Sequence, residues 1–252
     1  MKKNDVVKAE CLDYTFAGLG IVKVDNFSIF IKGLIKGEIA EVKIISLKKN
    51  YGYGKIINLL KTSEERIEAP CALYPQCGGC QILHMSYQEQ LSFKLNYLNQ
   101  CLKKIGNLSV KSSIINGTHE LFHYRNKVQI PFAISNNRLI SGFYRVNSHD
   151  IVDMNYCYLQ STESNKIYQT IKDYLSANSL EGIYHLLIKE GHYSKEVMIA
   201  FISSNTNTKD YQSLIKLLVN SFDNIKSIIL NEKKQDSNVI LGDREIVLYG
   251  ND

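Results

Sequence analysis

Three cysteines in one short loop are the residues of this chain best suited to chemistry. They are Cys71, Cys77 and Cys80, and their C-x5-C-x2-C spacing brings three thiolates within reach of one metal centre. Gly78 and Gly79 have no side chains, so the backbone can wrap closely around sulfur. A fourth, distant cysteine would complete the ligand set. The spacing therefore predicts a metal or iron–sulfur site.

Two kinds of centre suit four thiolates. Structural zinc takes four cysteines in tetrahedral geometry, and zinc ribbons normally present two C-x2-C pairs. This chain has one such pair, so the pattern favours a 4Fe-4S cluster, with zinc as the alternative. Cys11 and Cys101 lie outside this set, and we expect both to be packing residues.

The cysteine loop and the segments around it resemble a known family. Residues 70–80, followed by residues 81–90, are similar to the iron–sulfur loop of the bacterial RNA uracil-5-methyltransferases, the rRNA and tRNA 5-methyluridine enzymes of the RlmD and TrmA type. Residues 124–127 and 142–149 agree in the same order, and the resemblance covers essentially the whole chain. It implies that Cys157 is the fourth ligand of a 4Fe-4S cluster, with a structural or RNA-shaping role.

The resemblance also implies parts that this sequence does not show. Members of the family continue into a Rossmann-like domain with a glycine-rich S-adenosylmethionine loop, a catalytic cysteine and a general base. The sequence stops at Asp252 and contains no G-x-G-x-x-G. We therefore expect no catalytic and no cofactor-binding residues here, and S-adenosylmethionine only in the full-length family.

The function expected from the sequence follows from these points. It is the amino-terminal RNA-binding and 4Fe-4S portion of an S-adenosylmethionine-dependent 23S rRNA (uracil-5-)-methyltransferase, truncated and inactive alone. A separate methyltransferase domain would then act in trans. The alternative is a stand-alone RNA-binding module with an iron–sulfur cluster or zinc and no enzymatic activity.

Charge and composition indicate the partner and the compartment. Residues 1–60 hold ten lysines against six acidic residues, whereas the rest of the chain is nearly neutral. A basic module suggests RNA, with rRNA expected rather than tRNA. No apolar stretch approaches a membrane span and no signal core follows Met1. We expect a cytoplasmic protein, in which cysteines bind metal rather than form disulfides.

Residues 1–60 read as short strands separated by turns, which predicts a small closed barrel of the OB type and resembles the TRAM domain of the family. The tyrosines of Tyr51-Gly-Tyr-Gly could stack on bases while neighbouring lysines bind phosphates. The alternative is that these rings only pack the barrel. The candidate RNA contacts in this segment are Lys48, Lys49, Tyr51, Tyr53 and Lys55.

Residues 61–252 are expected to form an α+β domain that carries the cluster loop, so the fold class is α+β. A capping box at Ser86 and Glu89 starts a helix that Gly106 ends. Helices near 162–177 and 208–222 alternate with strands near 183–190, 195–203, 226–231 and 238–248. Asn136-Asn137 joins two strands as a hairpin. Arg125 and Lys127, at the start of the first of these strands, are further candidate RNA contacts, or else a solvated strand end.

Overall fold

The chain folds into two compact units in a computed structural model, which describes residues 1–178, 180–233 and 239–251. The first unit comprises residues 1–75 and 80–118, and the second comprises residues 76–79 together with the chain from residue 119 onward. The sequence suggested a division at residue 60. The first unit instead keeps the polar segment after the barrel and the following helix.

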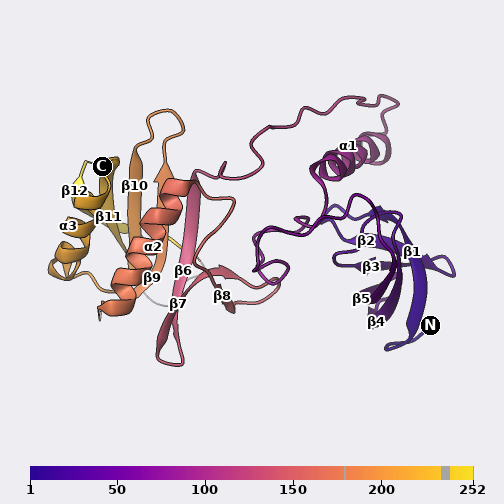
Figure 1. Cartoon of the computed structure of the whole chain (residues 1–252), viewed down its shortest axis with the longest axis horizontal. Coiled ribbons are helices and arrows are strands. Elements are labelled where there is room, and N and C mark those ends of the chain that lie inside the picture. Colours follow the sequence, from indigo (N-terminus) through magenta and orange to yellow (C-terminus); the bar gives the residue numbers. More distant parts are fainter. Residues whose placement is uncertain (179, 234–238, 252) are drawn as a thin grey trace. The chain divides into compact units, whose positions relative to one another are not determined.

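Five strands of the first unit close into a barrel (Figure 1). Their order around the barrel is β1-β2-β3-β5-β4, and β3 pairs with β5 in parallel while the other pairs are antiparallel. This order is that of an OB-type barrel and confirms the predicted class. The strands are β1 (Val6–Tyr14), β2 (Gly20–Val24), β3 (Phe27–Ile31), β4 (Ile39–Leu47) and β5 (Tyr51–Lys61).

The barrel interior is filled by alternate residues of each strand. Along β3, Ile29 and Ile31 are fully buried while Phe30 between them is half-buried, as a period of two requires. The largest inward side chains are branched aliphatics that resist water and fit a pleated wall. The barrel core consists of Ala9, Cys11, Val22, Ile29, Ile31, Leu34, Ala40, Val42 and Ile44.

Two glycines of β5 face this interior because no side chain fits there. A Cβ added at Gly54 would lie 2.4 Å from the Val42 side chain, and one at Gly52 would lie 2.9 Å from Leu47. Such distances demand movement in a packed core. The Tyr-Gly-Tyr-Gly run therefore places its glycines inward and its rings outward.

The helix α1 (Tyr87–Lys104) begins where the sequence predicted it. The Ser86 hydroxyl accepts a hydrogen bond from the Glu89 amide, which is half of the expected capping box. The Glu89 carboxylate, however, accepts from a barrel tyrosine instead of returning to Ser86. Phe93 is the buried residue of this helix, whereas Leu98 and Ile105, in an apolar repeat of helical period, are exposed.

The second unit is a seven-stranded sheet with the order β12-β11-β10-β9-β6-β7-β8. Its pairs are antiparallel except β10 with β11, which α3 connects as a parallel crossover. The helices α2 and α3 lie side by side against the sheet (Figure 1). The elements are β6 (Lys127–Ser135), β7 (Arg138–Tyr144), β8 (Ile151–Asp153), α2 (Thr162–Ala177), β9 (Ile183–Glu190), β10 (Val197–Ser203), the 3-10 turn Thr208–Tyr211, α3 (Gln212–Ser221), β11 (Ile225–Glu232) and β12 (Arg244–Gly250).

Most expected elements of this unit are present. The hairpin turn at Asn136-Asn137 is confirmed, and the two residues have φ of +49° and +58°, as a type I′ turn requires. The first residue of the strand expected over 238–248 lies outside the described residues, and the observed strand begins at Arg244. The α+β class is confirmed. In the described residues, no helix is long and apolar enough to cross a membrane.

Candidate nucleic-acid interface

The four-cysteine metal centre is the main prediction that the structure corrects. Among the described residues, no three His, Cys, Asp or Glu side chains are grouped so that they could hold a metal ion. Cys71 and Cys80 belong to the first compact unit, whereas Cys77 and Cys157 belong to the second. The lack of a metal-holding group among the described residues contradicts the predicted 4Fe-4S cofactor and iron–sulfur domain, while the assignment of the four cysteines as ligands stays a prediction.

Cys11 and Cys101, which we expected to be packing residues, differ in how deeply they are buried. Cys11 is almost wholly buried in the barrel core, and burial raises the pKa of its thiol to about 12. A thiol with such a pKa stays protonated and is a poor nucleophile. Cys101 is half-buried on α1. No cysteine is assigned a catalytic role.

Three aromatic rings form a platform on the outer wall of the barrel. Phe30 of β3 stacks on Tyr51 of β5 with ring centroids 5.4 Å apart. Tyr53 closes the group edge-on, 5.9 Å from Phe30 and 5.7 Å from Tyr51. The parallel register sets Phe30 beside Tyr53. Tyr51 is 36% exposed, and the other two rings are half-buried, so the platform offers ring surface to solvent. We call these three residues the barrel platform.

Lysines adjoin the barrel platform on β5, on the neighbouring strands and in the turn before Tyr51. Lys55 follows Tyr53 on the outward side of β5 and is paired with Lys43 of β4. Lys23 of β2 is paired with Ser28, which is itself paired with Tyr51. Lys48 and Lys49 are exposed in the turn before Tyr51. Within the part of the chain that the structure describes, none of these five lysines forms an ion pair. Their charges are available to an anionic partner.

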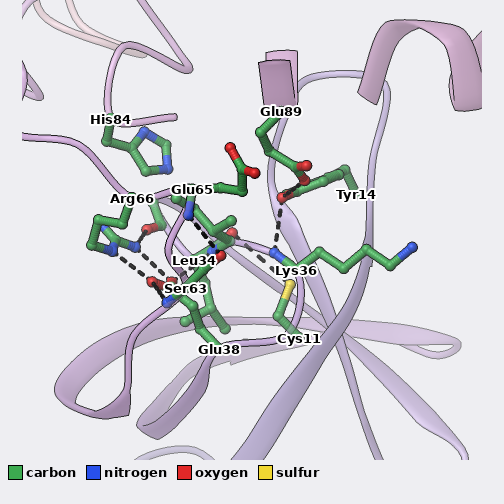
Figure 2. Close-up of polar contacts among 12 residues, drawn as sticks. Cys11, Tyr14, Leu34, Lys36, Glu38, Ser63, Glu65, Arg66, His84 and Glu89 are labelled. Carbon is green, nitrogen blue, oxygen red and sulfur yellow. Dashed lines mark hydrogen bonds and ion pairs between the residues drawn. The ribbon is translucent and has the colours of Figure 1, made fainter. Parts of the chain in front are cut away.

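A buried ion pair ties the segment after β5 back to the barrel (Figure 2). Glu38 is fully buried, and its carboxylate accepts from the Arg66 guanidinium at 2.6 Å and from the Ile35 amide at 2.8 Å. Burial raises the pKa of Glu38, but the Arg66 guanidinium and the backbone amides outweigh it and lower the pKa overall. Arg66 also donates to the Gly33 carbonyl. The carboxylate therefore stays charged and clamps residues 63–66.

A second set of contacts fastens α1 to the barrel. Figure 2 shows the Tyr14 hydroxyl between the Glu89 carboxylate and the Lys36 amide. Tyr14 donates to Glu89 at 2.5 Å and accepts from Lys36 at 2.8 Å. Burial and the Glu89 carboxylate raise the pKa of Tyr14, so the phenol stays protonated. The Tyr14 ring also packs edge-on against Phe93. These contacts hold α1 against the barrel within the first unit.

His84 is a buried titratable group beside this network. It is 4% exposed, its Nδ1 bonds the Tyr74 hydroxyl, and its Nε2 is buried without a partner among the described residues. Burial, with a contribution from Arg66, lowers the pKa of His84 to about 4. The imidazole is therefore neutral at physiological pH, which is the form that burial favours.

The structure separates the predicted RNA contacts into two groups. Tyr51, Tyr53 and the three predicted lysines lie on or beside one wall of the barrel, as expected from their spacing. Arg125 is half-buried and Lys127 is exposed at the start of β6, in the second unit. Sequence reasoning missed Phe30, Lys23 and Lys43. Strand alternation marks all three as outward-facing, but their neighbours are set by strand pairing.

The barrel matches a known domain family, and nearly the whole chain aligns with known proteins. Residues 4–57 match the TRAM domain family, which coincides with the barrel. Over 99% of its length the chain is 36% identical to an uncharacterized RNA methyltransferase of Clostridium acetobutylicum. It is also 36% identical over its whole length to one of Staphylococcus epidermidis. The chain spans 57% and 58% of the lengths of these relatives.

A solved structure shares this fold. The tRNA (uracil-54, C5)-methyltransferase of Pyrococcus abyssi, in complex with S-adenosyl-L-homocysteine, superposes with a TM-score of 0.66. The superposition covers 96% of this chain and 55% of that protein, at 21% sequence identity. At this identity the likeness establishes the fold of both units.

These findings correct the function and cofactor predicted from the sequence. The predicted function, an inactive amino-terminal portion or a stand-alone module without enzymatic activity, is corrected because 99% of the chain aligns with proteins named as RNA methyltransferases, of whose length it spans 57%. The expectation that S-adenosylmethionine has no place on this chain is contradicted by the fold neighbour solved with S-adenosyl-L-homocysteine. A separate methyltransferase domain acting in trans gains no support.

Proposed function

We propose that this chain belongs to the RNA uracil-5-methyltransferases and acts in S-adenosylmethionine-dependent methylation of RNA. The observation that carries the proposal is the alignment of 99% of the chain with proteins named as RNA methyltransferases. The fold shared with a tRNA (uracil-54, C5)-methyltransferase supports uracil C5 as the target atom. In that reaction the methyl group leaves the sulfonium of S-adenosylmethionine and replaces the C5 proton, which is released.

The barrel platform and its lysines are the RNA-binding part of this function. Aromatic rings accept unpaired bases by stacking, independently of sequence. Lysines beside them neutralise phosphates and release counterions. The barrel combines both features on one wall, with Tyr51 and Tyr53 as stacking rings and Lys55 among the phosphate contacts. The match to the TRAM domain family agrees with this assignment.

The experiment is a methyl-transfer assay on the full chain with labelled S-adenosylmethionine. An unmodified 23S rRNA fragment and an unmodified tRNA are tested side by side, because the preference for rRNA stays a prediction. We expect label in RNA, recovered as 5-methyluridine after nuclease digestion. Label recovered in any other nucleoside would contradict uracil C5 as the target, and no label on either RNA would contradict the activity.

RNA binding is measured separately so that it can fail independently. Fluorescence anisotropy with a uridine-rich single strand reports the Kd of the full chain. The double variant Tyr51→Ala/Tyr53→Ala is expected to bind at least about tenfold more weakly, because each stacked base contributes roughly 1–3 kcal/mol. Tyr51→Phe/Tyr53→Phe keeps the rings and serves as the matched control. Equal affinities of the alanine and phenylalanine variants would exclude stacking at this platform.

A further inference from the structure

A second group of aromatic rings lies in the second unit, outside the barrel. Phe122, His123, Tyr156 and Tyr158 contact one another through ring centroids 5.3 to 6.0 Å apart. Tyr156 is 42% exposed, His123 is exposed, and the other two are half-buried. Single exposed rings are common on protein surfaces, but contiguous groups of them mark contact sites. We call these four residues the ring patch.

The ring patch is held rigidly by backbone and side-chain hydrogen bonds. The His123 amide donates to the Tyr158 carbonyl at 2.8 Å, and the Arg125 amide donates to the Leu159 carbonyl at 2.8 Å. Asn165, in the first turns of α2, exchanges hydrogen bonds with the backbone of Cys157 at 2.8 and 3.0 Å. The turn that carries both tyrosines is therefore anchored to a helix before any ligand arrives, which lowers the entropic cost of binding.

His123 occupies a backbone conformation that costs energy. Its φ is +58°, in the left-handed region that side-chain-bearing residues rarely adopt. The hydrogen bonds of the surrounding segment hold His123 in this conformation. His123 Nδ1 lies 2.8 Å from the Gln160 carbonyl and must be the donor, because a carbonyl only accepts. In the neutral ring Nε2 is then an acceptor, 3.5 Å from the Tyr156 hydroxyl. The patch thus presents ring faces with polar edges.

Charge on the same segment indicates the kind of partner. Arg125, two residues beyond His123, has no ion-pair partner within residues 1–178, 180–233 and 239–251. Stacking rings and an unneutralised guanidinium on the same segment suit a base and its phosphate. We propose that the ring patch binds an unpaired nucleobase of RNA, as a second stacking surface distinct from the barrel platform. This inference rests on the proposed function, since it assumes that the chain binds RNA.

The chain contains no tryptophan, which permits a direct test. Tyr156→Trp introduces a single indole into the exposed position of the patch, and a stacked base quenches indole fluorescence. Titration of this variant of the chain with a uridine-rich 12-mer single strand is expected to quench the emission, and a duplex of the same sequence is expected to quench it less. The control is Tyr249→Trp on β12, also partly exposed and separated from β6 by three strands, whose emission is expected to stay unchanged.

Affinity gives the second readout. Tyr156→Ala is expected to weaken single-strand binding about tenfold, whereas Tyr156→Phe and Tyr249→Ala bind within about twofold of the parent chain. The inference is overturned if the parent chain binds RNA by anisotropy while the indole emission of Tyr156→Trp does not change and Tyr156→Ala keeps full affinity. If the parent chain binds no RNA at all, the proposed function fails as well. Thermal melting of Tyr156→Ala verifies that the exposed substitution leaves the fold intact.

Discussion

The barrel platform and the ring patch offer the same chemistry from two different kinds of backbone. The platform stands on paired strands, where the alternation of Tyr51 and Tyr53 with inward glycines directs each ring outward. The ring patch stands on two irregular segments joined by hydrogen bonds between residues 123–125 and 158–161. A sheet orients side chains by its period, whereas a loop needs a dedicated anchor for each one.

The two regions differ in charge as well. Five lysines adjoin the barrel platform, on strands or in the turn before β5. On the segment of the ring patch, Arg125 carries the charge that we assign to RNA binding. Binding at the platform should therefore depend strongly on salt, and binding at the patch should depend mainly on stacking. We therefore expect the barrel platform to supply general affinity for the RNA backbone and the ring patch to hold a particular unpaired base.

The greatest loss of stability should come from the buried ion pair, which supports the barrel region alone. Arg66→Ala leaves the fully buried Glu38 carboxylate without its cation, and this should cost about 3–5 kcal/mol of unfolding free energy. Urea unfolding measures the loss. Single-strand binding at the barrel platform should fall with it, while RNA should still quench the indole of Tyr156→Trp in the second unit when both substitutions are combined.

The control for this prediction is Arg244→Ala. Its ion pair with Glu232 spans 3.5 Å, and the Arg244 side chain is 71% exposed, so its loss should cost less than about 1 kcal/mol. Equal effects of the two substitutions would show that the Glu38–Arg66 pair is not the clamp described above.

A more moderate change should follow from pH. His84 has a pKa of about 4 in the folded chain against about 6.5 when unfolded. The unfolded state then binds more protons between these values, so stability is full above pH 6.5 and falls as pH falls toward 4. The loss should approach about 2–3 kcal/mol. Thermal melting of the chain at pH 7 and at pH 4.5 measures it.

His84→Phe removes the titrating ring while keeping an aromatic in the buried position. The slope of stability against pH between 6.5 and 4.5 should become shallower. His149→Phe, at an exposed histidine of the second unit, should leave that slope unchanged. A parent chain whose melting temperature is constant over this range would show that His84 is not held neutral by burial.

The mildest change tests the contrast in charge. Lys55→Gln should reduce the slope of log Kd against log salt by about 0.7, the value for one phosphate contact on a single strand. Tyr156→Ala should weaken binding at every salt concentration and leave the slope as it was. The matched control is Lys216→Gln, an exposed lysine of α3, which should change neither quantity. A slope unchanged by Lys55→Gln would place the phosphate contacts elsewhere.

Several elements could be predicted from the sequence because their causes are local. Alternating apolar residues and turn signals predict the barrel strands, and Asn136-Asn137 predicts its hairpin because asparagine tolerates positive φ. The helix over 162–177 was predicted with its observed bounds, since Ser161 caps it and its apolar face is regular. The exposed Leu98 and Ile105 show the limit, because periodicity alone does not say what a helix face will meet.

How far each candidate site could be predicted depended on how far apart its residues lie in the sequence. The outward direction of Tyr51 and Tyr53 can be read from the amino-acid order, since a strand's period and the inward glycines leave one choice. Long-range packing was needed to bring Phe30 beside them and to join residues 122–123 to residues 156–158. The physical reason is that local geometry orients a side chain, whereas packing between distant segments chooses its neighbours, and a binding site is made of neighbours.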